Sequence, residues 1–242
     1  MPPHRCYVPD AVPGRVDLPS DEAHHLVRVL RAGTGSEVVV FDGRGHEWLG
    51  RVATIDRAGV RVDLLEPRTP VPEPPVAVTP AAALLKGDQM NTVVRDATAM
   101  GAAAIQPVAS AHVAVPERAW RDRSLDRWRR IAVSSAKQCG RAVVPEIGEI
   151  AHLREVLAAH AASMTIVCVE PGRMDGATAV TDRPPAGTRV LLCIGPEGGW
   201  SADEIAAARA HGARLLSLGP RVLRAEIAPT VALSALWTRW AW

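Results

Sequence analysis

Three short segments place glycine, proline or acidic residues directly after nearly all-apolar runs. They are CVEP at residues 168–171, IGPEGG at 194–199 and LGPRVLR at 218–224. Apolar runs of this length are typical of strands in a parallel sheet, and ligands bind beyond the carboxyl ends of such strands. One Gly-Pro pair could simply end a strand, whereas two similar turns in one sheet indicate a binding pocket. We therefore expect the three segments to form one ligand site.

The IGPEGG turn differs from the common phosphate-binding loops. The chain has no G-x-x-x-x-G-K-S/T motif, and its nearest match to G-x-G-x-x-G, at residues 43–48, lies in an N-terminal hairpin pattern. Ser201 and Glu204 have the spacing of a capping box, which would satisfy part of the following helix's amino terminus internally. Glu197 would also repel a phosphate. The expected guest is neutral or cationic, with an adenine or amide edge that the backbone can bind.

The elements that must position these segments change character at EPRTPVPEPP, residues 66–75. Prolines at this density cannot continue a helix or a central strand, so we expect a linker here. Before it, SEVVVFDGRGHEWLGRVATI predicts a hairpin that turns at Asp42-Gly43, and GVRVDLLE predicts another strand. SDEAHHLVRVLRA predicts a short helix capped by Ser20 or Asp21. The pattern indicates a small β-barrel with one helix over residues 1–70.

After the linker, strand and helix patterns alternate. The predicted strands are VAVTPAAALL, AAIQPVA, MTIVCVE, RVLLCI and ARLLSL. Helices are predicted in DQMNTVVRDATAMG, ending at Gly101, and in SLDRWRRIAVSSAKQCG, ending at Gly140. The last helix carries an apolar stripe of Leu233, Leu236, Trp237 and Trp240, which predicts core packing or part of a dimer interface. This alternation predicts an α/β domain with a parallel sheet over residues 76–242.

Bulk composition limits the class of protein. The chain has 242 residues, 48% of them hydrophobic, and a net charge of +2, which alone does not indicate nucleic-acid binding. Its four cysteines form no C-x-x-C motif, so we expect no structural zinc, and Cys168 and Cys193 are expected to be buried. No apolar stretch reaches the roughly 18 residues of a membrane span. We expect a cytoplasmic protein without a metal.

Together, IGPEGGWSADEI and LGPRVLRAEIAPTVALSAL resemble the SPOUT superfamily of S-adenosylmethionine-dependent RNA methyltransferases. More narrowly, the chain resembles the bacterial 16S rRNA uridine-N3 methyltransferase family, because HHLVRVLRAGTGSEVVVFDG, LLKGDQMNTVVRDATAMGA and AKQCGRAVVPEI follow in that family's order. The resemblance implies a PUA-like RNA-binding β-barrel followed by an α/β SPOUT methyltransferase domain with a parallel sheet. That domain should contain a trefoil knot, a rare exception to the rule that protein chains are not knotted. The resemblance also implies a homodimer that acts on 16S rRNA of the small ribosomal subunit.

The resemblance assigns S-adenosylmethionine to the three segments that follow the strands. The implied cofactor contacts are Val169, Glu170, Pro171, Ile194, Gly195, Pro196, Glu197, Gly199, Leu218, Gly219, Val222 and Leu223. The sequence departs from the family's pattern at Gln89, where arginine is usual, at Ala99-Met100 and at Lys137. These departures concern expected RNA contacts and leave the cofactor segments intact.

Methyl transfer to uracil N3 requires alignment of the reactants and loss of the N3 proton. Arg224 is the first catalytic candidate, because it follows a cofactor segment and could stabilise the developing uracil anion. Glu226 could accept the proton or orient Arg224. The alternative is that Arg224 and Glu226 form a surface ion pair that contributes little to stability.

Phosphate contacts are expected from Arg28, Arg31, Lys86 and Arg141. The arginine run at 127, 129 and 130 fits either an RNA contact or a solvated helix face, because an acidic residue is interleaved with it. Three other functions remain: RNA binding without catalysis, SPOUT methylation of another RNA site, and nicotinamide-dependent oxidoreduction. The intact glycine segments disfavour the first, and the missing G-x-G-x-x-G between strand and helix disfavours the last.

Overall fold

The computed structural model describes residues 3–113, 123–171, 177–178 and 182–242. Contacts divide the chain into two compact units. The first comprises residues 1–73 together with 133–144, and the second comprises residues 74–132 together with 145–242. Helix α3 (Arg123–Cys139) therefore contributes its last residues to the first unit.

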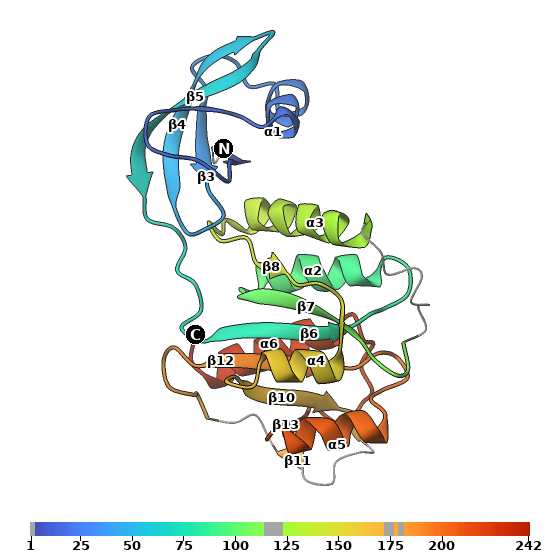
Figure 1. Cartoon of the computed structure of the whole chain (residues 1–242). Coiled ribbons are helices and arrows are strands. Elements are labelled where there is room, and N and C mark those ends of the chain that lie inside the picture. The colour runs from blue at the N-terminus through green and yellow to red at the C-terminus, as the bar shows by residue number, and fades with distance from the viewer. Residues whose placement is uncertain (1–2, 114–122, 172–176, 179–181) are drawn as a thin grey trace. The chain divides into compact units, whose positions relative to one another are not determined.

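The first unit is built on a five-stranded sheet in the order β1-β3-β4-β5-β2 (Figure 1). Its strands are β1 (His4–Tyr7), β2 (Arg15–Asp17), β3 (Glu37–Phe41), β4 (Glu47–Asp56) and β5 (Gly59–Arg68). β1 runs parallel to β3, and the other pairs are antiparallel. The predicted hairpin is confirmed, since β3 and β4 pair across the turn that starts at Asp42.

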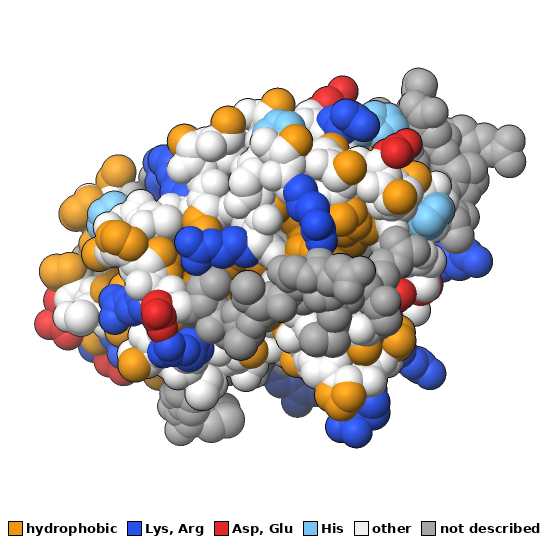
Figure 2. All heavy atoms as spheres, turned by 90° about the horizontal axis from the view of Figure 1, so that it is seen from below, with side chains coloured by type: hydrophobic (Ala, Val, Ile, Leu, Met, Phe, Trp, Pro, Cys, Tyr) orange, Lys and Arg blue, Asp and Glu red, His pale blue; other side chains and the backbone are white. Residues whose placement is uncertain are grey.

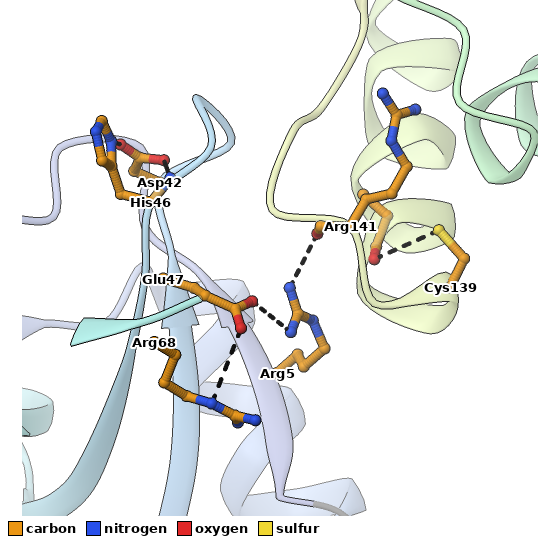
Figure 3. A network of polar contacts seen from close by, with 8 residues as sticks. Arg5, Asp42, His46, Glu47, Arg68, Cys139 and Arg141 are labelled. Atoms are coloured by element: carbon orange, nitrogen blue, oxygen red, sulfur yellow. Dashed lines mark hydrogen bonds and ion pairs between the residues drawn. The ribbon is translucent and has the colours of Figure 1, made fainter. Parts of the chain in front are cut away.

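Asp42 fixes that turn through hydrogen bonds to its carboxylate. It accepts from the backbone N–H groups of Arg44 at 2.7 Å and His46 at 3.1 Å, and His46 Nδ1 lies 2.7 Å from its other oxygen (Figure 3). Burial acts to raise the pKa of Asp42, but the hydrogen bonds from His46 and Arg44 lower it overall. The turn is thus held by a buried, ionised side chain.

Two local predictions for the first unit were wrong. β5 continues to Arg68, so Glu66 and Pro67 belong to a strand and not to the linker. Pro67 is tolerated because β2 pairs with β5 only over residues 61–63, so in the described structure this end of β5 is paired on one side only, with β4.

The predicted helix cap was also wrong. Helix α1 (Ser20–His24) has Pro19 at its N-cap and no side-chain cap. It continues as a π-helical turn, η1 (His25–Val29), in which Leu26 is buried while His25 and Val29 are exposed. In this wider π turn His25 and Val29 do not share a buried face.

The second unit contains one long sheet, in the order β11-β13-β10-β12-β6-β7-β8, with β9 also paired to β7. The strands are β6 (Ala77–Ala83), β7 (Ala104–Ala109), β8 (Glu146–Ile147), β9 (Ala151–His152), β10 (Met164–Val169), β11 (Ala177–Thr178), β12 (Arg189–Ile194) and β13 (Arg214–Ser217). Every pairing among them is parallel, which confirms the predicted α/β class.

Helices cover both faces of this sheet. They include α2 (Gln89–Ala99), α4 (Leu153–Ala159), α5 (Ala202–Ala210) and α6 (Ala228–Arg239). α2 contacts α6, whereas α4 contacts α5, and in Figure 1 α4 lies in front of the strands while α6 lies behind them. Strands covered on both faces are mostly apolar, which explains why β12, RVLLCI, is apolar and buried after Arg189.

Both expected helix ends are confirmed, and so are the buried residues of the second unit. Gly101 and Gly140 follow their helices with φ values of +83° and +85°, conformations that favour glycine. The α6 stripe, Leu233, Leu236, Trp237 and Trp240, is buried in the core. Burial raises the pKa of the Cys168 thiol to about 12 and also raises that of Cys193, so both behave as apolar residues.

Within the described ranges, no helix combines the length and apolar character that crossing a bilayer requires. The same residues contain no group of three or more histidine, cysteine or acidic side chains placed to hold a metal ion.

Candidate functional site

The strand order brings the three predicted segments together. β10 is paired with β13 on one side and with β12 on the other, all in parallel, so their carboxyl ends lie at one edge of the sheet. The segments that follow these strands line one pocket, which has about 700 Å³ of space free of protein atoms when the part open to solvent is included.

All twelve residues expected to contact a cofactor line this pocket. The lining residues that sequence reasoning missed are Cys168, Trp200, Ile205, Arg221, Ala225 and Ala228. Trp200 and Arg221 belong to the same two glycine-containing segments, so closer attention to those segments could have found them. Ile205 and Ala228 come from helices, and no local signal marks them.

Trp200 forms one wall of the pocket and joins two of its loops. Its Nε1 donates to the Cys168 carbonyl oxygen at 3.2 Å, and the ring is buried. A Cβ atom on Gly195 would lie 3.2 Å from Nε1 and 3.3 Å from Cε2 of this indole. Glycine at residue 195 thus suits the close approach of the backbone to Trp200, because a side chain there would press on the indole ring.

A second glycine, Gly199, is held in a left-handed conformation with φ +67°. A Cβ there would lie 3.3–3.5 Å from the Glu170 carboxylate, so this carboxylate packs directly against the turn. His112 holds the same turn, because its Nδ1 lies 3.1 Å from the carbonyl oxygens of both Gly198 and Gly199. Carbonyl oxygens only accept, so this nitrogen must carry the proton.

The capping box predicted for the next helix is confirmed. Ser201 Oγ accepts from the Glu204 N–H at 3.2 Å, and Glu204 Oε2 accepts from the Ser201 N–H at 2.8 Å. Glu204 Oε1 also accepts from the Ala111 N–H at 2.9 Å. The start of α5 is thus satisfied by its own side chains, which agrees with the expectation that the turn serves something other than a phosphate.

The lining is mostly apolar and backbone, with three charged side chains: Glu170, Glu197 and Arg221. Gly219 has φ +116° and meets no heavy atom within 4 Å of its Cβ position, so space is open beside it. On the face drawn in Figure 2, hydrophobic side chains are visible inside a hollow, and lysine or arginine side chains lie beside it. Such a lining can hold an apolar ring system and attract a cation through its carboxylates.

The two catalytic candidates lie next to the pocket lining and are not part of it. Leu223 and Ala225 line the pocket, whereas Arg224 and Glu226 do not. Arg224 Nη1 lies 3.8 Å from Glu226 Oε1. The Glu226 side chain is largely buried, and the Gln89 amide lies 3.4 Å from its Oε2. The structure therefore brings the pair together at the edge of the pocket without testing a catalytic role.

The four predicted RNA contacts fall into two groups. Arg28 and Arg31 of the first unit and Lys86 of the second are exposed. Arg141 is buried, and its Nε donates to Glu73 Oε1 at 3.0 Å while Nη2 bonds to the other carboxylate oxygen. Its backbone carbonyl accepts from Arg5 Nη2 at 2.9 Å (Figure 3). Arg141 is thus already engaged within the chain.

The arginine run on α3 is exposed and paired with acidic side chains. Arg127 Nη2 bonds to Asp88 at 2.9 Å, and Arg129 bonds to Asp126 at 3.2 Å and to Glu149 at 3.3 Å. Of the two interpretations of the run, an RNA contact or a solvated helix face, these ion pairs favour the solvated helix face.

Two models of known domain families match different parts of the chain. A model of RNA methyltransferase domains matches residues 72–237, and a model of the RNA methyltransferase PUA domain matches residues 18–65. The ribosomal RNA small subunit methyltransferase E of Synechocystis sp. is 35% identical over 225 residues, which cover 91% of this chain and 72% of that protein. The protein of the same name from Mycobacterium bovis is 34% identical over 231 residues, covering 91% and 86%.

Solved structures give the same relationship. The ribosomal RNA small subunit methyltransferase E of Neisseria gonorrhoeae, bound to S-adenosyl methionine, is 29% identical with a TM-score of 0.86, and 98% of each chain is covered. A Legionella pneumophila structure with bound S-adenosylmethionine is 28% identical with a TM-score of 0.89 and the same coverage. The chain belongs to the RNA methyltransferase family and, within it, to the ribosomal RNA small subunit methyltransferase E proteins.

Proposed function

We propose that this protein methylates N3 of a uridine in 16S rRNA of the small ribosomal subunit, with S-adenosylmethionine as the methyl donor. The observation that carries the proposal is the single pocket at the ends of β10, β12 and β13, lined by all twelve expected cofactor residues. The relatives named for small-subunit rRNA methylation, and the relatives solved with S-adenosylmethionine, support it.

The residues of the pocket fit this cofactor. Ile194, Leu218 and Leu223 offer apolar contacts to an adenosine, and the open space beside Gly219 leaves room for a ring. Glu170 and Glu197 would offset the positive charge of the sulfonium and the amino group. S-adenosylmethionine supplies a methyl group on a positively charged sulfur, so the protein has only to bind, align and deprotonate.

The chain's own part in the reaction is assigned to Arg224 and Glu226. The N3–H bond of uracil must break as the new N–CH₃ bond forms, and the negative charge spreads to the carbonyl oxygens of the ring. The exposed Arg224 guanidinium can bind such an oxygen, and the stabilisation it provides increases as negative charge develops on the ring. The carboxylate of Glu226 accepts the N3 proton.

The two parts of the chain take different tasks in this proposal. Residues 1–70 form a PUA-like domain that binds RNA, and residues 76–242 form the knotted methyltransferase domain, which dimerises. Arg28, Arg31 and Lys86 are the proposed phosphate contacts. Arg141 was expected to join them, but its buried ion pair with Glu73 favours a structural role. A ribosomal substrate places the protein in the cytoplasm.

Two measurements test the function. Equilibrium binding should show about one S-adenosylmethionine per chain and no comparable affinity for NADH. Tight binding of NADH would instead favour an oxidoreductase. Incubation with methyl-labelled cofactor and small-subunit RNA should then label one uridine, with the methyl on N3. Binding of RNA without cofactor binding would overturn catalysis altogether. Label at another nucleotide would agree with methyltransferase activity and would overturn the proposed position of methylation in the RNA.

A further inference from the structure

A fourth segment, at the end of β7, contacts the turn that follows β12. The segment comprises residues 110–113, and in the sheet β6 lies between β7 and β12 (Figure 1). None of its four residues lines the pocket. The segment nevertheless bonds to the turn at residues 195–199 and to the first turn of α5. The pocket lining alone therefore does not account for what holds this turn in place.

The contact with the turn is made by His112. Its Nδ1 lies 3.1 Å from the carbonyl oxygens of both Gly198 and Gly199, so its one hydrogen is shared between two acceptors. The neighbouring Ala111 N–H donates to Glu204 Oε1 at 2.9 Å, while the other oxygen of that carboxylate caps α5. Two adjacent residues thus tie the turn and the helix after it to the end of β7.

The two glycines of the turn pack against different side chains. A Cβ atom on Gly198 would lie 2.9 Å from the Cβ of His112, closer than a real Cβ atom comes to its neighbours. A Cβ on Gly199 would instead lie 3.3–3.5 Å from the carboxylate of Glu170, which lines the pocket. The turn is therefore packed against one side chain that lines the pocket and one that does not.

We propose that His112 is a positioning residue that holds the turn at residues 195–199 in the conformation that binds S-adenosylmethionine. This inference rests on the proposed function, which places the cofactor in this pocket, and deepens it. A loop that is already held in its binding conformation loses less conformational entropy when the ligand binds, so the ligand binds more tightly. Because His112 does not line the pocket, its effect falls on cofactor affinity and not on methyl transfer.

The test compares three replacements of His112 by calorimetry with S-adenosylmethionine. The amide nitrogen of His112→Asn is as many bonds from the backbone as Nδ1 is, and it carries two hydrogens for the two carbonyl oxygens. The amide nitrogen of His112→Gln is one bond further out, and His112→Ala has no donor. We expect His112→Asn to bind within twofold of the unaltered protein, about the scatter of such comparisons, and the other two variants to bind about five- to tenfold more weakly, the effect of one lost hydrogen bond.

The rate and a second histidine separate positioning from other roles. At saturating cofactor, the single-turnover methylation rate of all three variants should stay within a few-fold, since a lost ground-state contact affects binding alone. His211→Ala is the matched control, because Nδ1 of His211 also lies 2.9 Å from a backbone carbonyl oxygen, that of Ala207 in α5, and His211 does not line the pocket. It should leave cofactor affinity unchanged.

Three results would overturn the proposal. The first is unchanged affinity in both His112→Ala and His112→Gln. The second is a loss in His112→Asn as large as that in His112→Gln, because the hydrogen bonds from Nδ1 would then not be the cause. The third is an equal loss in His211→Ala, which would indicate a general effect on the fold. If the unaltered protein binds no S-adenosylmethionine, the proposed function itself fails.

Discussion

Arg224 Nη1 lies 3.8 Å from Glu226 Oε1, and the exposure of the two side chains differs widely, at 80% for the arginine and 14% for the glutamate. An ion pair with one partner this exposed contributes little to stability, about 0–1 kcal/mol. The glutamate lies beside the Gln89 amide, whereas the guanidinium is largely exposed to solvent. The arrangement leaves Arg224 available to a substrate that approaches the pocket edge.

Arg224→Ala should therefore reduce chemistry far more than cofactor binding. The arginine contacts the substrate most strongly when uracil carries negative charge, so its loss falls on the transition state. We expect the single-turnover methylation rate to fall about 10²-fold or more. Cofactor affinity of the same variant, measured by calorimetry, should stay within a few-fold.

Arg154→Ala is the control for that change, because Arg154 is an exposed arginine on α4 that does not line the pocket. It should leave rate and affinity unchanged. A rate for Arg224→Ala within a few-fold of the original would make Arg224 structural. A collapse of cofactor affinity along with the rate would place it in the cofactor pocket instead.

Gly195→Leu should abolish binding of S-adenosylmethionine. Even a Cβ at this position would approach the Trp200 ring to 3.2 Å, and a leucine side chain must either displace the ring or enter the pocket. Gly33→Leu is the control, since Gly33 has no heavy atom within 4 Å of its Cβ position and no left-handed φ. Calorimetry should show binding for the control alone, with the far-ultraviolet circular dichroism of both variants unchanged. Normal affinity in Gly195→Leu would separate this loop from the cofactor.

The sheet and the pocket could be predicted because their signals are local. RVLLCI and MTIVCV are nearly all apolar, and the turns that follow them contain glycine or proline at the ends of the strands. A parallel sheet brings the loops after neighbouring strands to the same edge, so one shared ligand site could be expected from the pattern. The twelve individual contact residues were implied by the family resemblance, and no local signal marked the helix residues Ile205 and Ala228.

The inclusion of residues 133–144 in the first unit could not be predicted, because it rests on contacts between residues far apart in sequence. Lys137 Nζ lies 2.7 and 2.8 Å from the two carboxylate oxygens of the buried Glu22. Val143 forms β-bridges with Gly43 and Arg44. Neither the charge at residue 137 nor the apolar residue at 143 indicates its partner. Lys137, where this sequence departs from the family's pattern, thus forms an ion pair within the first unit.

RNA affinity should depend on Arg28 and Arg31. Both side chains are exposed in the first unit, and no hydrogen bond or ion pair engages either guanidinium within the described residues. Replacing both with glutamine should weaken binding to rRNA and flatten the dependence of log affinity on log salt by about 1.5, as expected for two lost phosphate contacts. Arg51→Gln with Arg57→Gln removes the same charge from other exposed positions of this unit and should leave the slope unchanged. Equal slopes for the two double variants would exclude a phosphate contact at Arg28 and Arg31.

Arg141 should behave differently, because its guanidinium is buried and bonded to Glu73 through two nitrogens. Removing one partner of a buried ion pair leaves an uncompensated charge, which costs about 3–5 kcal/mol when both groups are fully buried. Glu73 is one-third exposed, so water offsets part of that cost, and we expect Arg141→Ala to lower the free energy of unfolding by about 2 kcal/mol.

The measurement is urea unfolding of Arg141→Ala, Glu73→Ala and the double variant, together with the salt dependence of RNA binding. If the pair is structural, the double variant should lose less than the sum of the two single changes, because no charge is left unpaired. The salt slope of Arg141→Ala should then equal that of the unaltered protein under conditions where it is folded. A stable Arg141→Ala whose slope is flatter by about 0.7–0.9 would instead identify Arg141 as a phosphate contact that leaves Glu73 when RNA binds.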